Sequence, residues 1–335
     1  MRFQSPISRR ALAGRALGLA LAGGALALAA GPAQADNHGL EEVHFLIPGG
    51  AGGGWDGTAR GTGEALTGSG LVGNASFENM SGGGGGKAIA HLIETADQAD
   101  NTLMVNSTPI VIRSLQGVFP QSFRDLTPVA GTIGDYAALV VNTDSDIADF
   151  RQLVARYRGA ADQVAIGGGS VAGGMDHLVA AMVMKAAGAN PQEVKYVPYD
   201  AGGKAMAGLL SKEIQALSTG FSEAVEMSKQ GQVRILCVTA PERVGTMADV
   251  PTCTEEGAEA VFVNWRGFFG PPGLSEEKKQ AYIDTFNKMY DTPEWATVRD
   301  RNGWVDIYNP GADFITFLEA QEKEVGDLMK ELGFL

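Results

Sequence analysis

EVHFLIPGGAGGGWDGTARGTGEAL, residues 42–66, contains the pattern that decides the fold. Residues 42–47 are predicted to form a strand that Pro48 ends, and residues 56–66 are predicted to form a helix. The run between them is almost entirely glycine. Glycine permits positive φ, and the helix that follows presents free N–H groups at the positive end of its dipole. The stretch therefore predicts a strand-to-helix turn that can hold an anion.

The same unit of strand, glycine-rich turn and helix recurs three more times. It is predicted for residues 76–95, 164–187 and 195–210, with turns at 80–86, 167–174 and 198–203. Alternating short strands and helices favour the α/β class. A single glycine run is most simply a tight connection. Four such runs in one chain favour a ligand site assembled from several loops.

The first 35 residues predict an export signal. They contain Arg2, Arg9, Arg10 and Arg15, no acidic residue, and an apolar run that ends in Ala33-Gln34-Ala35. This is typical of a general secretory signal, and the paired arginines also resemble a twin-arginine signal. Its removal would change the net charge from −13 to −17, because four arginines and no acid are lost. Such an acidic chain is not expected to bind nucleic acid or anionic lipid.

Residues with catalytic or metal-binding chemistry are sparse. A phosphate-binding Walker loop fails at Ser81 and Ala88, and a dinucleotide GxGxxG motif fails at Trp55. A secreted serine hydrolase could use Ser170 and His177, but the turn lacks the last glycine of a nucleophile elbow. Four histidines and two cysteines are too few for a metal centre rich in these ligands. We therefore expect a binding protein with no metal or cofactor, and keep the hydrolase as the alternative.

The two cysteines leave two interpretations open. Cys237 lies in an apolar stretch predicted as a strand, residues 233–239, and Cys253 follows sixteen residues later. An oxidising compartment would allow a disulfide between them. Two free thiols, with Cys237 buried in its strand, is the simpler interpretation.

Taken in order, the motifs along residues 42–335 resemble the extracytoplasmic solute receptors of tripartite tricarboxylate transporters. The resemblance implies an α/β fold of the type II periplasmic binding protein kind, with two domains joined by two crossover strands and the ligand between them. Domain one would comprise residues 36–134 plus 261–335, and domain two residues 135–260. The motifs that carry the resemblance are Ile47-Pro48, Gly52-Gly53-Gly54-Trp55-Asp56, Glu78-Asn79, Asp125-Leu126-Thr127-Pro128-Val129, Val197-Pro198-Tyr199, Gly202-Gly203 and Asp249-Val250-Pro251-Thr252.

The resemblance also implies a function. The protein would be a periplasmic receptor, a monomer without cofactor, that delivers a small carboxylate to the integral-membrane permease of the transporter. Gly54-Trp55-Asp56 and Arg266 resemble the tricarboxylate-type branch, so citrate or a related di- or tricarboxylate is the expected ligand. The positions that match ligand contacts are Gly52, Gly53, Gly54, Trp55, Asp56, Asn106, Ser107, Thr108, Ser170, Gly173, Tyr199, Gly202, Gly203, Thr219 and Arg266.

Charge at this site can be arranged in more than one way. Arg266 can bind a ligand carboxylate through two parallel N–H bonds, or it can form a salt bridge within the protein. Lys204 and Lys87 are the other candidate cations, and Trp55 can instead pack its loop against its own helix. Many family members have an aspartate in the turn at residues 219–222, which this chain lacks. We therefore expect no repelling carboxylate there and tolerance of a highly charged ligand.

Overall fold

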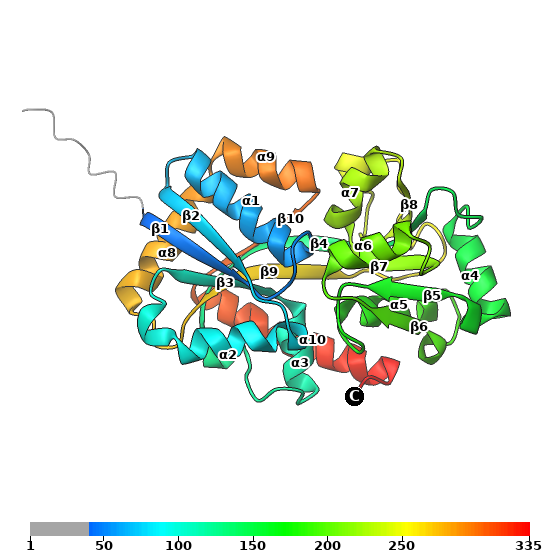
Figure 1. Ribbon diagram of the computed structural model, residues 1–335, viewed down its shortest axis with the longest axis horizontal. Coiled ribbons are helices and arrows are strands. Elements are labelled where there is room, and N and C mark those ends of the chain that lie inside the picture. The colour runs from blue at the N-terminus through cyan, green and yellow to red at the C-terminus, as the bar shows by residue number, and fades with distance from the viewer. Residues whose placement is uncertain (1–39) are drawn as a thin grey trace, which may run out of the picture. The chain divides into compact units, whose positions relative to one another are not determined.

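A mixed sheet runs through residues 40–335, the part of the chain that the structure, a computed structural model, describes (Figure 1). The predicted export signal, residues 1–35, lies outside the described residues. The strand order is β2-β1-β3-β9-β4-β7-β5-β6, with β8 and β10 also paired with β4. The strands are β1 Leu40–Ile47, β2 Val72–Asn79, β3 Thr102–Ser107, β4 Thr127–Asn142, β5 Ala165–Gly168, β6 Lys195–Pro198, β7 Ala216–Gly220, β8 Val233–Val238, β9 Val263–Gly270 and β10 Val305–Pro310.

Strand β4 belongs to two groups of strands. Its first part, residues 127–136, pairs with β9 and β10, and its last part, residues 137–142, pairs with β7 and β8. We call β1, β2, β3, β9, β10 and the first part of β4 the first lobe, together with the helices around them. The second lobe comprises β5 to β8, the last part of β4 and helices α4 to α7 (Figure 1).

Helices follow the strands in both lobes. In the first lobe they are α1 Gly54–Gly68, α2 Gly86–Glu94, α3 Thr108–Leu115, α8 Glu276–Tyr290, α9 Pro293–Asn302 and α10 Ala312–Leu332. In the second lobe they are α4 Phe150–Gly159, α5 Met175–Ala186, α6 Gly202–Leu210 and α7 Phe221–Lys229. The four predicted units of strand, turn and helix are confirmed, with ends that differ by a few residues. None of the helices among residues 40–335 is long and apolar enough to cross a membrane.

The way a helix begins differs between the periphery and the centre of the fold. Asp149, Ser275 and Thr292 cap α4, α8 and α9, each accepting a hydrogen bond from a first-turn amide. Helices α1, α5 and α6 instead begin after Gly53, Gly174 and Ala201, without a side-chain cap. Uncapped first turns leave N–H groups available to another acceptor. In α5 and α1 these acceptors are side chains from elsewhere: the amide of Asp176 donates to the hydroxyl of Ser170, and the amide of Gly54 donates to Glu223.

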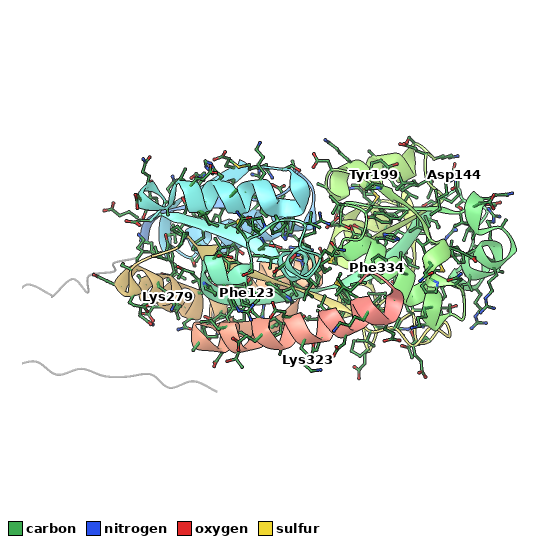
Figure 2. The ribbon with its side chains drawn as sticks, turned by 90° about the horizontal axis from the view of Figure 1, so that it is seen from below. Phe123, Asp144, Tyr199, Lys279, Lys323 and Phe334 are labelled. Carbon is green, nitrogen blue, oxygen red and sulfur yellow. A yellow bond between two sulfur atoms is a disulfide. The ribbon has the colours of Figure 1, made fainter. Side chains whose placement is uncertain are left out.

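Apolar packing ties the lobes together at the C-terminal end of the chain. One hydrophobic cluster includes Met104 of the first lobe, Leu178 of the second, and Leu332 of α10. Phe334 lies just beyond α10 with its ring 4.8 Å from that of His177, on the side of the second lobe (Figure 2). In the second lobe, a disulfide joins Cys237 to Cys253, so the simpler interpretation of two free thiols is wrong.

Candidate functional site

A cavity of about 320 Å³ lies where the strand-to-helix turns of both lobes meet. This volume is at the lower end of the range for small-molecule sites, about 300–1,000 Å³, and fits a small ligand. Of the residues predicted from sequence, eight line it: Gly53, Gly54, Trp55, Ser107, Ser170, Tyr199, Gly202 and Arg266. The other seven lie in or beside the same elements but do not line it: Gly52, Asp56, Asn106, Thr108, Gly173, Gly203 and Thr219.

Asp56 holds the shape of the turn between β1 and α1. Its buried carboxylate accepts hydrogen bonds from the amide of Gly52 at 3.0 Å, from Nδ2 of Asn79 at 3.0 Å and from Nε of Arg60 at 2.8 Å. Asn79 also donates to the carbonyl of Gly49, at 3.0 Å. Because this carboxylate forms its hydrogen bonds within the loop, it fixes the positions of the glycines that line the cavity. Asp56 itself does not line the cavity.

Trp55 connects the first turn to the end of β3. Its indole N–H donates to Oγ of Ser107 at 2.8 Å. A Cβ added to Gly49 would lie 2.9 Å from the ring, and one added to Gly85 would lie 3.5 Å from it. The ring therefore packs its own turn against α1 at Gly49, as the packing alternative expected, and it also contacts the glycine-rich turn after β2 at Gly85. Asn106 and Thr108, on either side of Ser107, are buried.

Several contacts join the turns of the first lobe to those of the second. Gln116, just after α3, donates from Nε2 to the carbonyl of Gly173 at 3.0 Å, and Ser81 donates to the carboxylate of Asp200. Gly203 lies so close to the first turn that a Cβ there would be 2.9 Å from the carbonyl oxygen of Ala51. The walls of the cavity are therefore in direct contact across the two lobes.

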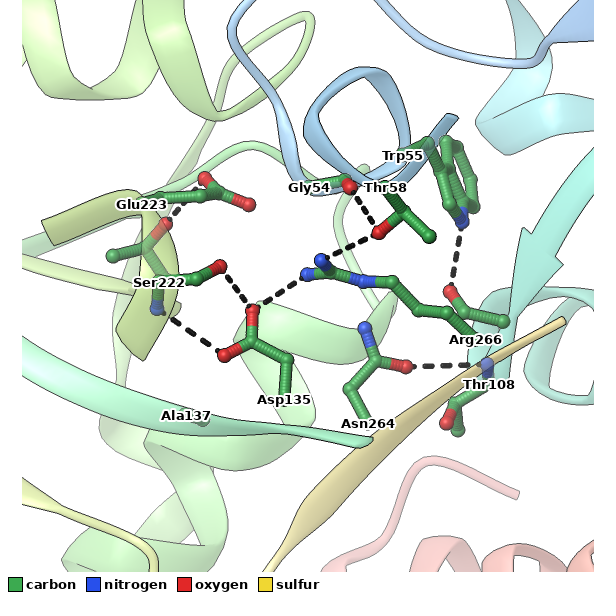
Figure 3. Close-up of polar contacts among 12 residues, drawn as sticks. Gly54, Trp55, Thr58, Thr108, Asp135, Ala137, Ser222, Glu223, Asn264 and Arg266 are labelled. Carbon is green, nitrogen blue, oxygen red and sulfur yellow. Dashed lines mark hydrogen bonds and ion pairs between the residues drawn. The ribbon is translucent and has the colours of Figure 1, made fainter. Parts of the chain in front are cut away.

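Arg266 forms a buried salt bridge in the floor of the cavity (Figure 3). Ile133 of β4 is the register partner of Arg266, so Asp135, two residues on, lies on the same face of the sheet. The guanidinium Nη2 donates to Oδ2 of Asp135 at 2.8 Å, and Nη1 donates to Oγ1 of Thr58 at 2.9 Å. The side chains of Arg266 and Asp135 are 2% and 0% exposed. The salt-bridge alternative therefore describes Arg266, whose contact with a ligand stays a prediction.

Glu223 corrects the expectation that the turn after β7 brings no carboxylate to the site. It lies in the first turn of α7, four residues after Thr219 of β7, whose hydroxyl donates to Oε2 at 2.7 Å, and it lines the cavity. Burial raises the pKa of Glu223, while Arg266 and the hydroxyl of Thr219 act in the opposite direction. The expectation concerned residues 219–222 alone, whereas the first turn of α7 brings residue 223 back toward β7.

Ser170 and His177 do not form a catalytic pair. The Ser170 hydroxyl accepts from the amide of Asp176 at 2.9 Å and contacts the hydroxyl of Tyr196 at 3.0 Å. Nδ1 of His177 accepts the amide N–H of Gly173 at 3.1 Å, and its ring stacks on Tyr196 at 4.5 Å. Burial lowers the pKa of His177 to about 4, so the ring is neutral near pH 7. The geometry gives no support to the hydrolase alternative.

Arg113, in the last turn of α3, is a cavity residue that the sequence argument missed. It is only 9% exposed, and no ion pair among residues 40–335 includes it. Nη1 donates to Oε1 of Gln116 at 2.9 Å, whereas the buried Nε has no hydrogen-bond partner. Burial lowers the pKa of this guanidinium, which nevertheless keeps its charge because arginine starts from so high a value. In the sequence, the feature that could have indicated a buried arginine is the position of Arg113 directly after the apolar run Pro109-Ile110-Val111-Ile112.

The two lysines considered as further cations lie outside the cavity. Lys204 pairs with Asp200 at 3.1 Å and is 67% exposed, and Lys87 is exposed. Within residues 40–335, no group of three or more histidine, cysteine, aspartate or glutamate side chains could hold a metal ion. The cation that faces the cavity without a carboxylate partner in this part of the chain is therefore Arg113.

Comparison with solved structures identifies the fold. The periplasmic binding protein BugD has a TM-score of 0.79 at 19% identity, covering 88% of this chain and 98% of BugD. MatC from Rhodopseudomonas palustris, solved with bound malate, has a TM-score of 0.75 at 19% identity, covering 86% and 98% of the two chains. The fold is thus that of the periplasmic binding proteins, and the expected α/β class is confirmed.

Sequence comparison gives the family. The model of the tripartite tricarboxylate transporter family receptor matches residues 70–334, well over half of the chain, which therefore belongs to this family. A UPF0065 protein from the tcbD-tcbE intergenic region of Pseudomonas sp. (strain P51) is 27% identical over 281 residues, covering 82% of each chain. The family is one of solute receptors, so the protein is a receptor and not an enzyme. The resemblance stated from the sequence motifs is confirmed.

Proposed function

We propose that this receptor binds a small organic carboxylate in the cavity between its lobes and delivers it, in the periplasm, to the permease of a tripartite tricarboxylate transporter. The observation that carries the proposal is the cavity itself, which is lined by glycine-rich strand-to-helix turns of both lobes and by Arg113, whose guanidinium has no carboxylate partner among residues 40–335. An arginine recognises a carboxylate through two parallel N–H bonds. The malate bound by MatC is a ligand of this chemical class.

Citrate and related di- and tricarboxylates are the first ligands to test, and the charges around the cavity rank them. Arg266 is paired with Asp135, and Lys204 with Asp200. Glu223 and Asp176 add carboxylates to the wall. A trianion would therefore meet one guanidinium that has no carboxylate partner among residues 40–335, and two acidic side chains whose pKa values are raised by burial. We expect mono- and dicarboxylates to bind more tightly than citrate.

The proposed domains, residues 36–134 plus 261–335 and residues 135–260, would close around the ligand. Support comes from the hydrogen bonds that Gln116 and Ser81 make to the other lobe. Closure of two lobes on a ligand shifts a two-state equilibrium, because the ligand contacts both lobes only in the closed state. Small-angle scattering should give a smaller radius of gyration with saturating ligand. An unchanged profile with a confirmed ligand would contradict this division.

Thermal unfolding with a panel of organic acids tests the function. A ligand at 100 times its Kd stabilises the folded state by about 2.7 kcal/mol, which is readily detected. Mono-, di- and tricarboxylates should be compared with amines and sugars of similar size as controls. Stabilisation by carboxylates alone supports the proposal, and a lack of response to every carboxylate would overturn it.

A further inference from the structure

Arg113 is held at the junction between the lobes. Gln116 accepts from its Nη1 at 2.9 Å and donates in turn to the carbonyl of Gly173, in the second lobe. A Cβ at Gly84 would lie 3.3 Å from Nε of Arg113 and 3.4 Å from the side chain of Val171. One edge of the guanidinium is thus fixed by Gln116, while Nε is buried at the cavity without a partner. Nε of Arg266 is likewise buried without a hydrogen-bond partner in the described part of the chain, so Arg113 is distinguished by having no carboxylate partner there.

The carboxylate of Glu223 lies at the glycine-rich helix starts, where the sequence predicted that the carboxylate of the ligand would bind. A Cβ at Gly202, where α6 begins, would lie 1.8 Å from Oε2 of Glu223, and one at Gly54, where α1 begins, would lie 2.7 Å from Oε1. The carboxylate therefore sits against the first residues of two helices, where their positive ends favour an anion. A ligand carboxylate directed to the same place would meet both steric exclusion and like charge.

We propose that the ligand places its carboxylate on Arg113 and donates a hydrogen bond from a hydroxyl or ammonium group to Glu223. This inference rests on the proposed function and narrows its ligand to a small carboxylate that carries a donor group. Both side chains line the same cavity, but they lie beside different glycines. Arg113 is next to Gly84, whereas Glu223 is next to Gly54 and Gly202. The carboxylate of Glu223 already accepts from the hydroxyl of Thr219 at 2.7 Å, and a carboxylate has further acceptor positions that a ligand donor can use.

Isothermal titration of the mature receptor with succinate, malate and aspartate tests the proposal, because these dicarboxylates differ in hydrogen, hydroxyl or ammonium at one carbon. Wild type should bind malate or aspartate at least about 10-fold more tightly than succinate, the discrimination expected for one hydrogen bond. Tighter binding of aspartate assigns an ammonium donor, and tighter binding of malate assigns a hydroxyl donor. Lactate, alanine and propionate repeat the comparison with a single carboxylate.

Variants test which side chain contacts each end of the ligand. Arg113→Met should weaken every carboxylate of the series by at least about 10-fold, and Arg113→Lys by less, since lysine keeps the charge without the two parallel N–H bonds. Glu223→Gln should reduce the preference for the donor-bearing ligand over succinate. Arg124→Met is the matched control, because Arg124 is an exposed arginine paired with Glu322. Circular dichroism and thermal unfolding of each variant establish that it is folded.

The outcomes separate this inference from the proposed function. Equal affinity of wild type for all members of a series would overturn the inference and leave the carboxylate receptor intact. Unchanged or tighter binding of succinate and malate in Glu223→Gln, with the preference kept, would show that Glu223 accepts no bond from the ligand, and would also overturn it. Binding of no carboxylate by wild type would remove the proposed function together with the inference.

Discussion

Two buried arginines line the same cavity, and they differ in what neutralises them. Arg266 on β9 is 2% exposed and donates to Asp135 and Thr58 within 3 Å. Arg113 on α3 is 9% exposed, and its hydrogen bond within the described chain goes to the neutral side chain of Gln116. A buried ion pair is largely satisfied within the protein, whereas a buried cation without a carboxylate retains its attraction for an external anion.

An arginine that is buried and lines the cavity is therefore not necessarily a ligand contact. Both guanidiniums satisfy those criteria, yet the family resemblance pointed to Arg266 and not to Arg113. The distinction depends on Asp135, which is 131 residues away along the chain and adjacent across β4 and β9. What an arginine can do for a ligand is therefore decided by the partner that the fold gives it.

The largest expected effect comes from breaking the paired arginine. Asp135→Ala should lower the free energy of unfolding by about 3–5 kcal/mol, because it leaves the guanidinium of Arg266 buried without a counter-charge. Chemical denaturation gives the measurement. The double variant Asp135→Asn with Arg266→Met is the control, and it should recover most of the loss because no unpaired charge remains. A single variant as stable as wild type would show that the pair does not behave as a buried ion pair.

The acidic wall of the cavity should make stability depend on pH. Burial, with a smaller contribution from Glu223, raises the pKa of Asp176 from 3.8 to about 7. The folded state therefore keeps a proton that the unfolded state has lost. The stabilisation is complete below about pH 4 and is lost as pH rises through about 7, by up to about 4 kcal/mol.

Asp176→Asn tests this dependence, because the amide can still accept the N–H of Ser170 but cannot titrate. The difference in unfolding free energy between wild type and variant should change in favour of the variant between pH 4 and pH 8. Asp146→Asn, a change at an exposed aspartate paired with Arg156, is the control and should show no such trend. A constant difference across this range would mean that Asp176 is ionised throughout.

Removing the unpaired arginine should have a smaller effect of opposite sign. Arg113→Met should raise the free energy of unfolding by about 1 kcal/mol in the absence of ligand, because it replaces a desolvated donor with an apolar side chain of similar length. Urea denaturation without and with ligand measures both consequences. A loss of several kcal/mol without ligand would indicate that Arg113 is satisfied within the protein, and the contrast with Arg266 would disappear.

The smallest change in unfolding free energy is expected at an exposed arginine. Arg124 makes two hydrogen bonds to Glu322, both 2.9 Å, with half of its side chain exposed. Arg124→Met should change the free energy of unfolding by less than about 1 kcal/mol, since water screens such a pair. The measurement is the same denaturation series, repeated at high salt, where the difference should shrink further. A larger loss would show that hydrogen-bond geometry alone, without burial, accounts for the effect at Arg266.

Much of the fold could be predicted from the sequence, because the signals are local. The glycine runs mark where strands end and helices begin, and α1, α2, α5 and α6 start within two residues of their predicted positions. The cavity follows in part, since turns at the ends of adjacent strands converge. Asp135 and Glu223 could not be assigned in the same way, because their roles arise from strand register and from a helix that returns over its own turn. Both were visible only as acidic residues beside apolar sequence.

Glu223 can also be regarded as a tethered competitor. A group on the same chain acts at an effective concentration that reaches the millimolar range even for flexible links, and this carboxylate is held in place by Thr219. Any external carboxylate aimed at the starts of α1 and α6 must compete against it. Shortening Glu223 to a residue without charge would expose that anion site and redirect the receptor toward ligands with an additional carboxylate. In this way a single internal side chain can set the number of negative charges that the receptor accepts, without any change in the architecture of its loops.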